Sequence, residues 1–193
     1  MAEIEKMIPH ILTWEVGLKD SERKLPPREM YNAVKGRGYH CIPGDRGEDT
    51  MCGVTFKTFS EWRQKQGKPK PTIADLKALQ YDEWMAILKS GFWDRCKADR
   101  IANQSIAEML VDWCWVNGSV AIRKAQTVLS CVADGIVGAK TLAALNAKDS
   151  LSIFNRLKGE REKSYRDIVA LRPSQQKFFR GWMNRTESIK FEG

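Results

Sequence analysis

The sequence predicts a mainly helical protein with one small hairpin or loop region. Apolar residues recur at helical spacing through most of the chain, and helix-capping patterns precede several of these stretches. Glycines that would interrupt helices cluster between residues 36 and 53. A chain of 193 residues can bury one substantial core, or a main domain with a smaller appendage.

The first expected element is a helix that ends near Glu15. Pro9 must either kink this helix or start its final turns. Glu15 lies on the apolar face just before Gly17, so its carboxylate occupies a position where an apolar side chain is expected. Burial disfavours the charged form, so such a Glu can serve as an acid; a boundary Glu that turns into solvent is the alternative. The residues that define the apolar face are Ile4, Met7, Ile8, Ile11 and Leu12.

Residues from about 19 to 54 show no sustained periodicity, and we expect a long loop or small hairpin there. Within it, residues 45–55 combine glycines with carboxylates and hydroxyls, which can approach a ligand closely. A helix-borne Glu facing a polar hairpin would suit glycoside hydrolysis, in which one carboxylic acid protonates the leaving oxygen. A cation-binding acidic loop is the rival interpretation, although the spacing of Asp45 and Asp49 does not match an EF-hand.

Helical patterns return after this region. Thr72 with Asp75 resembles a capping pair, and Ser105 with Glu108 resembles a capping box. Gly118 can provide a left-handed C-cap. The expected helices cover about 59–63, 72–79, 82–90, 105–117, 120–129, 141–145, 151–169 and 175–190.

Composition narrows the class of protein. Hydrophobic residues make up 42% and charged residues 29%, as in soluble globular proteins, and no apolar run is long enough to cross a bilayer. Glu3 and Glu5 interrupt the N-terminus, which does not look like a secretory signal. Five cysteines form no CxxC pair, and with two histidines they give no zinc-ligand spacing. We therefore expect reduced thiols, no metal and synthesis in the cytoplasm.

The net charge of +8 and a pI near 9.3 favour a polyanionic partner. Nucleic acid, an anionic membrane and a bacterial wall polymer all fit. The basic residues are spread along the chain, so charge alone does not choose among these partners.

A set of motifs occurs in one order along nearly the whole chain. These are Glu15 with Gly17, Asp45-x-Gly47-x-x-Thr50-x-x-Gly53-Val54, Phe92-Trp93, Asp112 through Asn117-Gly118, Asp134-Gly135-x-x-Gly138-x-x-Thr141, and Gly181-Trp182-x-Asn184-Arg185. In this order they resemble the lysozyme-like muramidases of glycoside hydrolase family 108.

The resemblance implies a lysozyme-like helical domain over residues 1–118, followed by a helical peptidoglycan-binding type 3 region over 119–193. The implied substrate is the glycan strand of peptidoglycan, cut at the β-1,4 bond between N-acetylmuramic acid and N-acetylglucosamine. No metal or organic cofactor and no nucleic-acid partner are implied. A wall hydrolase made in the cytoplasm must reach the cell wall or periplasm, by release through a phage-type pore or by a dedicated secretion route.

The resemblance also assigns site residues. The family's catalytic Glu falls on Glu15, and its loop positions fall on Asp45 and Thr50, candidates for water activation or substrate positioning. Trp93 and Trp182 are candidate groove residues, since aromatic faces stack on pyranose rings.

Three further residues are candidates for substrate binding, and two of them have simpler structural explanations. Asp112 and Asn117 could line a cleft floor, but Asn117 before Gly118 also fits helix termination. Asp134-Gly135 is most simply a tight turn, with Thr141 capping the next helix. A wall-binding role for Asp134 rests on the resemblance alone.

The chain also departs from the family pattern. Val16 and Leu18 stand where Gly and Tyr are usual, and Glu48 replaces a second Gly. Val16 restricts the turn after the helix, and Leu18 removes an aromatic platform. Glu48 is either a second carboxylate or a solvated loop charge. A non-catalytic wall-binding or secretion-assisting protein is therefore the second hypothesis, and a helical nucleic-acid binder, based on charge alone, is the third.

Overall fold

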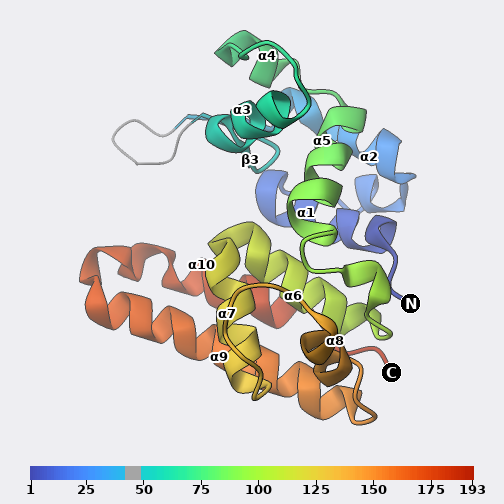
Figure 1. The fold of residues 1–193 in the computed structure, drawn as a ribbon. Coiled ribbons are helices and arrows are strands. Elements are labelled where there is room, and N and C mark those ends of the chain that lie inside the picture. The colour runs from blue at the N-terminus through green and yellow to red at the C-terminus, as the bar shows by residue number, and fades with distance from the viewer. Residues whose placement is uncertain (42–48) are drawn as a thin grey trace. The chain divides into compact units, whose positions relative to one another are not determined.

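A computed structural model of the chain describes residues 1–41 and 49–193. These residues form two compact units (Figure 1). The first unit is Glu5–Gly91, and the second unit comprises Met1–Ile4 and Phe92–Gly193. Helices and one small sheet make up the described elements, so the mainly helical prediction is confirmed. Of the described helices, none has the length and apolar character needed to cross a membrane.

The first unit is built on α1 (Ile4–Val16), whose apolar face is buried at Met7, Ile8, Ile11 and Leu12. The helix continues through Pro9, which lies inside it rather than at the start of a separate final segment. The hydroxyl of Thr13 donates to the Pro9 carbonyl at 2.6 Å, one turn earlier in the same helix. The other helices of this unit are α2 (Pro27–Val34), α3 (Phe56–Lys65), α4 (Ile73–Lys77) and α5 (Tyr81–Leu88).

Helix α2 lies within the region that we expected to be loop or hairpin, so that part of the prediction is wrong. It starts at Pro27, a residue suited to the first helical position because its missing N–H is not needed there. Short 3-10 turns at Glu22–Lys24 and Lys35–Arg37 flank it. The helix buries Tyr31, whose hydroxyl donates to the Leu79 carbonyl at 2.9 Å.

The expected hairpin is present. Strands β1 (Tyr39–His40), β2 (Thr50–Met51) and β3 (Val54–Thr55) form an antiparallel sheet in the order β1-β2-β3. Met51 pairs with Val54, and both side chains are buried. Thr55 ends β3 and also caps α3, because its hydroxyl accepts from the Thr58 amide at 3.1 Å.

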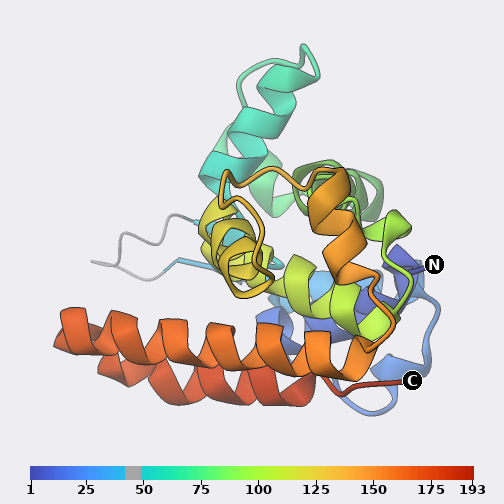
Figure 2. The ribbon, with the colours of Figure 1, turned by 60° about the horizontal axis from the view of Figure 1, so that its bottom comes forward.

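The second unit contains a central helix, α6 (Gln104–Asn117), which packs against α7 (Ser119–Val128) and α9 (Ser150–Leu171). Helix α8 (Ala139–Leu145) lies between α7 and α9 in sequence. Figure 2 shows α9 and α10 (Gln176–Ser188) lying side by side as an antiparallel pair.

The caps agree with the sequence prediction in one place and differ in two. The Thr72–Asp75 capping box is present at α4. At α6, however, Asn103 is the cap and accepts from the Ile106 amide at 3.1 Å, while Ser105 is buried inside the helix. At α8, Thr141 lies within the helix, and Gly138 precedes it without a side-chain cap.

A buried ion cluster joins three helices of the second unit. Asp112 on α6 accepts from Arg161 on α9 and from Arg185 on α10, each at 2.7 Å. The Asp112 and Arg161 side chains have no exposed surface, and Arg185 is 8% exposed. The charge-assisted hydrogen bonds from both guanidinium groups to one carboxylate offset the desolvation of the three groups.

The substitution Asp112→Asn should lower the free energy of unfolding by about 3–5 kcal/mol, because it leaves two arginines buried without a counter-charge. Urea titration of both proteins measures the difference. Asp167→Asn is the control, since Asp167 pairs with Lys163 on the exposed side of α9 and should contribute little. A loss no larger than that of the control would show that the cluster does not stabilise the fold.

Candidate active site

The turn between β2 and β3 is formed by Cys52 and Gly53. Both residues have positive φ, at +47° and +80°, as a two-residue type I′ hairpin turn requires. Cys52 is a non-glycine residue in the left-handed region, so the turn must be held by its neighbours. The Cys52 amide donates to the Gly38 carbonyl at 2.8 Å, and its carbonyl accepts from the Trp84 indole at 3.0 Å.

The Cys52 side chain is buried in the first unit. Burial raises the pKa of its thiol to about 12, so the sulfur is protonated at neutral pH. A Cβ atom on Gly38 would lie 2.4 Å from this sulfur, which explains why a glycine stands there. Cys52 is therefore a packing residue of the turn.

Glu15 lies directly against Gly53. A Cβ atom at position 53 would be 2.6 Å from Cγ and Cδ of Glu15 and 2.7 Å from its Oε2. No side chain fits in that space, so only glycine allows the carboxylate to rest on the turn. Glu15 is half-buried. This exposure is intermediate between the two predictions, a carboxylate buried with the apolar face and a carboxylate turned fully into solvent.

The end of α1 that carries Glu15 is fixed by a second set of contacts. Gly17 has φ +67° and its amide donates to the Thr13 carbonyl at 3.0 Å, which closes the helix. The Arg37 guanidinium donates to the carbonyls of Val16 at 3.4 Å and Gly17 at 3.2 Å. It also donates to both carboxylate oxygens of Glu22, at 2.9 and 2.5 Å.

The contact between Arg37 and Glu22 shifts the pKa of the Glu22 carboxyl group. The Arg37 guanidinium, followed by the Lys19 amide, lowers the pKa of Glu22 to about 2. The ionised carboxylate holds Arg37 in position, and Arg37 in turn satisfies two carbonyls at the end of α1. Glu22 therefore supports the position of the Glu15-bearing turn from a distance.

Thr50 lies in the same hairpin as the turn that meets Glu15. It pairs with Thr55, is half-buried, and its hydroxyl donates to the His40 carbonyl at 3.3 Å. Because side chains alternate along a strand, Thr50 points to the face opposite the buried Met51. Asp45 and Glu48 lie outside the described residues.

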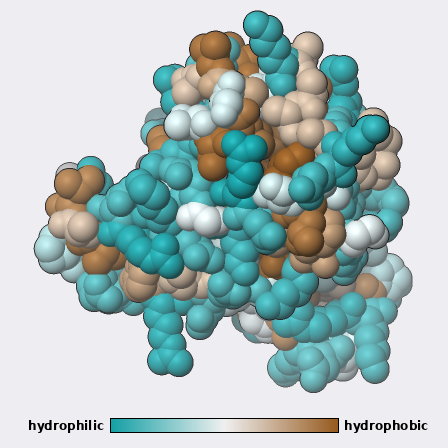
Figure 3. All heavy atoms as spheres, turned by 90° about the horizontal axis from the view of Figure 1, so that it is seen from below, coloured by the Kyte–Doolittle hydropathy of each residue, from teal (hydrophilic) through white to brown (hydrophobic). Residues whose placement is uncertain are grey.

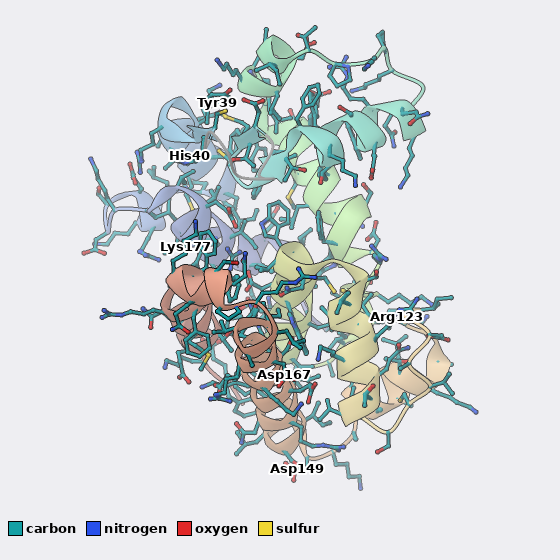
Figure 4. The ribbon with its side chains drawn as sticks, turned by 90° about the vertical axis from the view of Figure 1, so that its left-hand side faces the viewer. Tyr39, His40, Arg123, Asp149, Asp167 and Lys177 are labelled. Carbon is teal, nitrogen blue, oxygen red and sulfur yellow. The ribbon has the colours of Figure 1, made fainter. Side chains whose placement is uncertain are left out.

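Asp49 was considered from the sequence only as part of a cation-binding loop and not as a residue of a hydrolase site. The Tyr39 hydroxyl donates to its Oδ1, and this bond lowers the pKa of Asp49 and raises that of Tyr39 to about 12. The Lys77 ammonium lies 4.3 Å from the centre of the Tyr39 ring. Figure 4 marks Tyr39 and its neighbour His40 on β1. The signal available in the sequence was the position of Asp49 directly before Thr50.

In the second unit, two predicted substrate contacts are wrong. Asp112 has no exposed surface, and its oxygens are taken by Arg161 and Arg185. Trp93 is 2% exposed and is therefore a packing residue. Neither side chain offers a surface to a glycan.

Asn117 and Trp182, which were also predicted to contact substrate, differ in their surroundings. Asn117 accepts from the Tyr165 hydroxyl at 3.2 Å, next to Gly118 at the end of α6. Trp182 on α10 is half-buried and stacks on Tyr165, with the ring centres 5.2 Å apart. Phe178 also stacks on Trp182 at 6.0 Å, so Trp182 remains only partly accessible, whereas Asn117 mainly completes the helix end.

Asp134 belongs to a loop that is organised by the buried Gln126. The Gln126 amide nitrogen donates to Asp134 at 2.8 Å, and its oxygen accepts from the Gly135 amide at 2.8 Å. The tight turn predicted at Asp134-Gly135 is present, with Gly135 at φ +80°. The loop exposes Val132 (76%) and Ile136 (67%). Figure 3 shows hydrophobic patches scattered over a largely hydrophilic face.

In the described parts of the chain, no three His, Cys, Asp or Glu side chains are grouped closely enough to hold a metal ion. Glu15 beside a polar hairpin is instead an arrangement that can deliver a proton to a bound oxygen.

The contact between Glu15 and Gly53 can be tested by a double-mutant cycle. Gly53→Ala should destabilise the protein more than Gly67→Ala, because both residues have positive φ but Gly67 has open space around its Cα. Adding Glu15→Ala should recover part of the Gly53→Ala loss, since it removes the clashing atoms. Unfolding in urea measures the four proteins of the cycle and Gly67→Ala; additive losses in the cycle would contradict the close approach.

Acid should weaken the Arg37–Glu22 contact in a defined range. Because the folded-state pKa of Glu22 is lowered, its contribution is complete above the ordinary value of 4.5 and is lost as the pH falls toward about 2. Thermal unfolding followed from pH 6 to pH 2 should therefore show a steeper decline for the wild type than for Glu22→Gln. Parallel declines would show that this pair does not contribute to stability.

Comparisons with known proteins identify two matched segments in the chain. The family model described as glycosyl hydrolase 108 matches residues 34–118, and the one described as a predicted peptidoglycan domain matches residues 120–187. Comparison with curated proteins gave no match. Among solved structures, the chain is similar to SagA of Brucella abortus, with 25% sequence identity, 95% of this chain and 89% of that chain covered, and a TM-score of 0.74.

Glu15 lies before both matched segments, so its role does not follow from the family models themselves. The matches do account for most of the hairpin, the central helix α6 and the helices after it. The chain therefore carries a glycosyl hydrolase 108 domain matched over residues 34–118, followed by a predicted peptidoglycan domain over residues 120–187, and its mainly helical fold is lysozyme-like.

Proposed function

We propose that this protein hydrolyses the glycan strands of peptidoglycan at the β-1,4 bond between N-acetylmuramic acid and N-acetylglucosamine, with Glu15 as the general acid. The observation that carries the proposal is the close approach of Glu15 to Gly53. It gives the carboxylate a fixed position beside the polar hairpin of a glycosyl hydrolase 108 domain.

In the proposed reaction, the protonated Glu15 carboxyl group gives its proton to the glycosidic oxygen as the bond to the anomeric carbon breaks. A water molecule adds to that carbon and releases a proton to solvent, from which the Glu15 carboxylate regains the proton that it gave up. Asp45 or Thr50 orients this water or stabilises the oxocarbenium-like state. The Thr50 hydroxyl, which already donates to the His40 carbonyl, retains lone pairs that can accept from water.

The two parts of the chain would divide the work. We assign catalysis to residues 1–118 and wall binding to residues 119–193, in line with the boundary between the two family matches. The first family match ends with helix α6. This helix nevertheless packs against α7 and α9, which belong to the second match. The proposed wall contacts are the Asp134 loop and the exposed part of Trp182. The protein would be made in the cytoplasm and act at the cell wall or in the periplasm.

The test compares Glu15→Gln with the wild type on purified cell walls. Loss of the acid should reduce the rate of lysis by about 100-fold or more, while wall binding stays unchanged. Glu5→Gln is the matched control, because Glu5 lies on the same helix but is exposed. Turbidity and release of reducing ends measure the effect. Equal lysis by wild type and Glu15→Gln would remove Glu15 from the mechanism.

A second candidate function is wall binding without catalysis. It is favoured by Leu18, which stands where the family usually has Tyr and is only 8% exposed, so it offers no platform to a sugar ring. Co-sedimentation with walls combined with an absence of released reducing ends would favour this function over the hydrolase.

A further inference from the structure

Two cysteines of the second unit lie in direct contact. The thiol of Cys96 donates to the sulfur of Cys114 at 3.4 Å, across 18 residues of sequence. Both side chains are buried, at 0% and 1% exposure. The other cysteines differ, because Cys41 is exposed, Cys131 is half-exposed and Cys52 is buried in the first unit.

The backbone around both sulfurs is well fixed. The Cys96 amide donates to the Phe92 carbonyl at 3.0 Å, and the following Lys97 adopts φ +48° to close the turn. Cys114 belongs to α6, and the neighbouring Trp115 ring lies 4.7 Å from the ring of Phe92. A disulfide needs the sulfurs to come about 1.4 Å closer, which small side-chain rotations supply.

We propose that Cys96 and Cys114 form an intramolecular disulfide when the chain folds in an oxidising compartment. A thiolate of one cysteine attacks a disulfide oxidant, of the glutathione or dithiol-oxidase class, and releases one thiol from it. The second thiolate then displaces the other oxidant sulfur. The two cysteines lose two electrons and two protons in all, and the oxidant disulfide becomes two thiols.

The burial of Cys96 and Cys114 determines when the disulfide forms. The contact with Cys114, together with burial, raises the pKa of Cys96, and both sulfurs are shielded from solvent in the folded protein. The reduced folded protein therefore reacts slowly, and the bond forms while the chain folds. Action at the cell wall would bring the chain to such a compartment, but the sulfur contact does not depend on the proposed hydrolase activity.

The experiment uses the full chain with the accessible thiols removed, as the parent variant Cys41→Ser/Cys131→Ser. It is unfolded, reduced, and refolded with glutathione and glutathione disulfide. The refolded protein is then unfolded in the presence of N-ethylmaleimide, and it is digested with trypsin without reductant. We expect the dipeptide Cys96-Lys97 joined to the peptide 101–123, with the loss of two hydrogen atoms, and Cys52 alkylated. Alkylation of both Cys96 and Cys114, or bonding of either to Cys52 as the main product, would overturn the proposal.

Stability gives an independent measurement. The oxidised parent should unfold about 5–10 °C higher than the same protein with reductant, because the bond restricts the unfolded chain. The control adds Cys114→Ala to the parent and should show no response to reductant. Equal midpoints for the oxidised and reduced parent would count against the bond. If the control does not fold, the peptide mapping of the parent still decides the question.

Discussion

The Cys52–Gly53 turn is the constraint on which the first unit depends. Its positive φ angles are maintained by a carbonyl before β1 and by the Trp84 indole of α5. Its glycine then leaves the space that Glu15 fills. One backbone hydrogen bond, one hydrogen bond from a tryptophan side chain and one missing side chain thus bring segments far apart in sequence to the same point. The placement of the candidate acid is a result of turn geometry rather than of the apolar face of α1 alone.

Much of the fold could be predicted because its signals are local. Apolar periodicity located most helices, Thr72 with Asp75 marked a real cap, and the polar stretch before Val54 is a hairpin. Helix α2 escaped detection because its eight residues are short for a periodic pattern and lie among prolines and glycines. The cap of α6 was misplaced because several residues there could accept the same amide bond, and only the folded structure selects Asn103.

The candidate site was predictable in part. Glu15 was found from its position at the end of an apolar face, and the tight turn at Gly135 from its sequence. The assignment of Asp112 to a cleft failed because its partners, Arg161 and Arg185, are 49 and 73 residues away. An Asp on a helix looks the same in sequence whether it faces substrate or two buried arginines. Arg37 and Asp49 were missed for the same reason, since their roles come from tertiary contacts.

The ion cluster at Asp112 also fixes the register of the α9–α10 pair. Apolar packing tolerates small shifts of one helix along another, because similar side chains can exchange places. Hydrogen bonds from two guanidinium groups to one carboxylate are directional and do not allow this exchange. A shift of one residue would turn an arginine by about 100° and leave its charge facing apolar side chains. A helix of 22 residues is therefore held in one alignment by a single buried carboxylate.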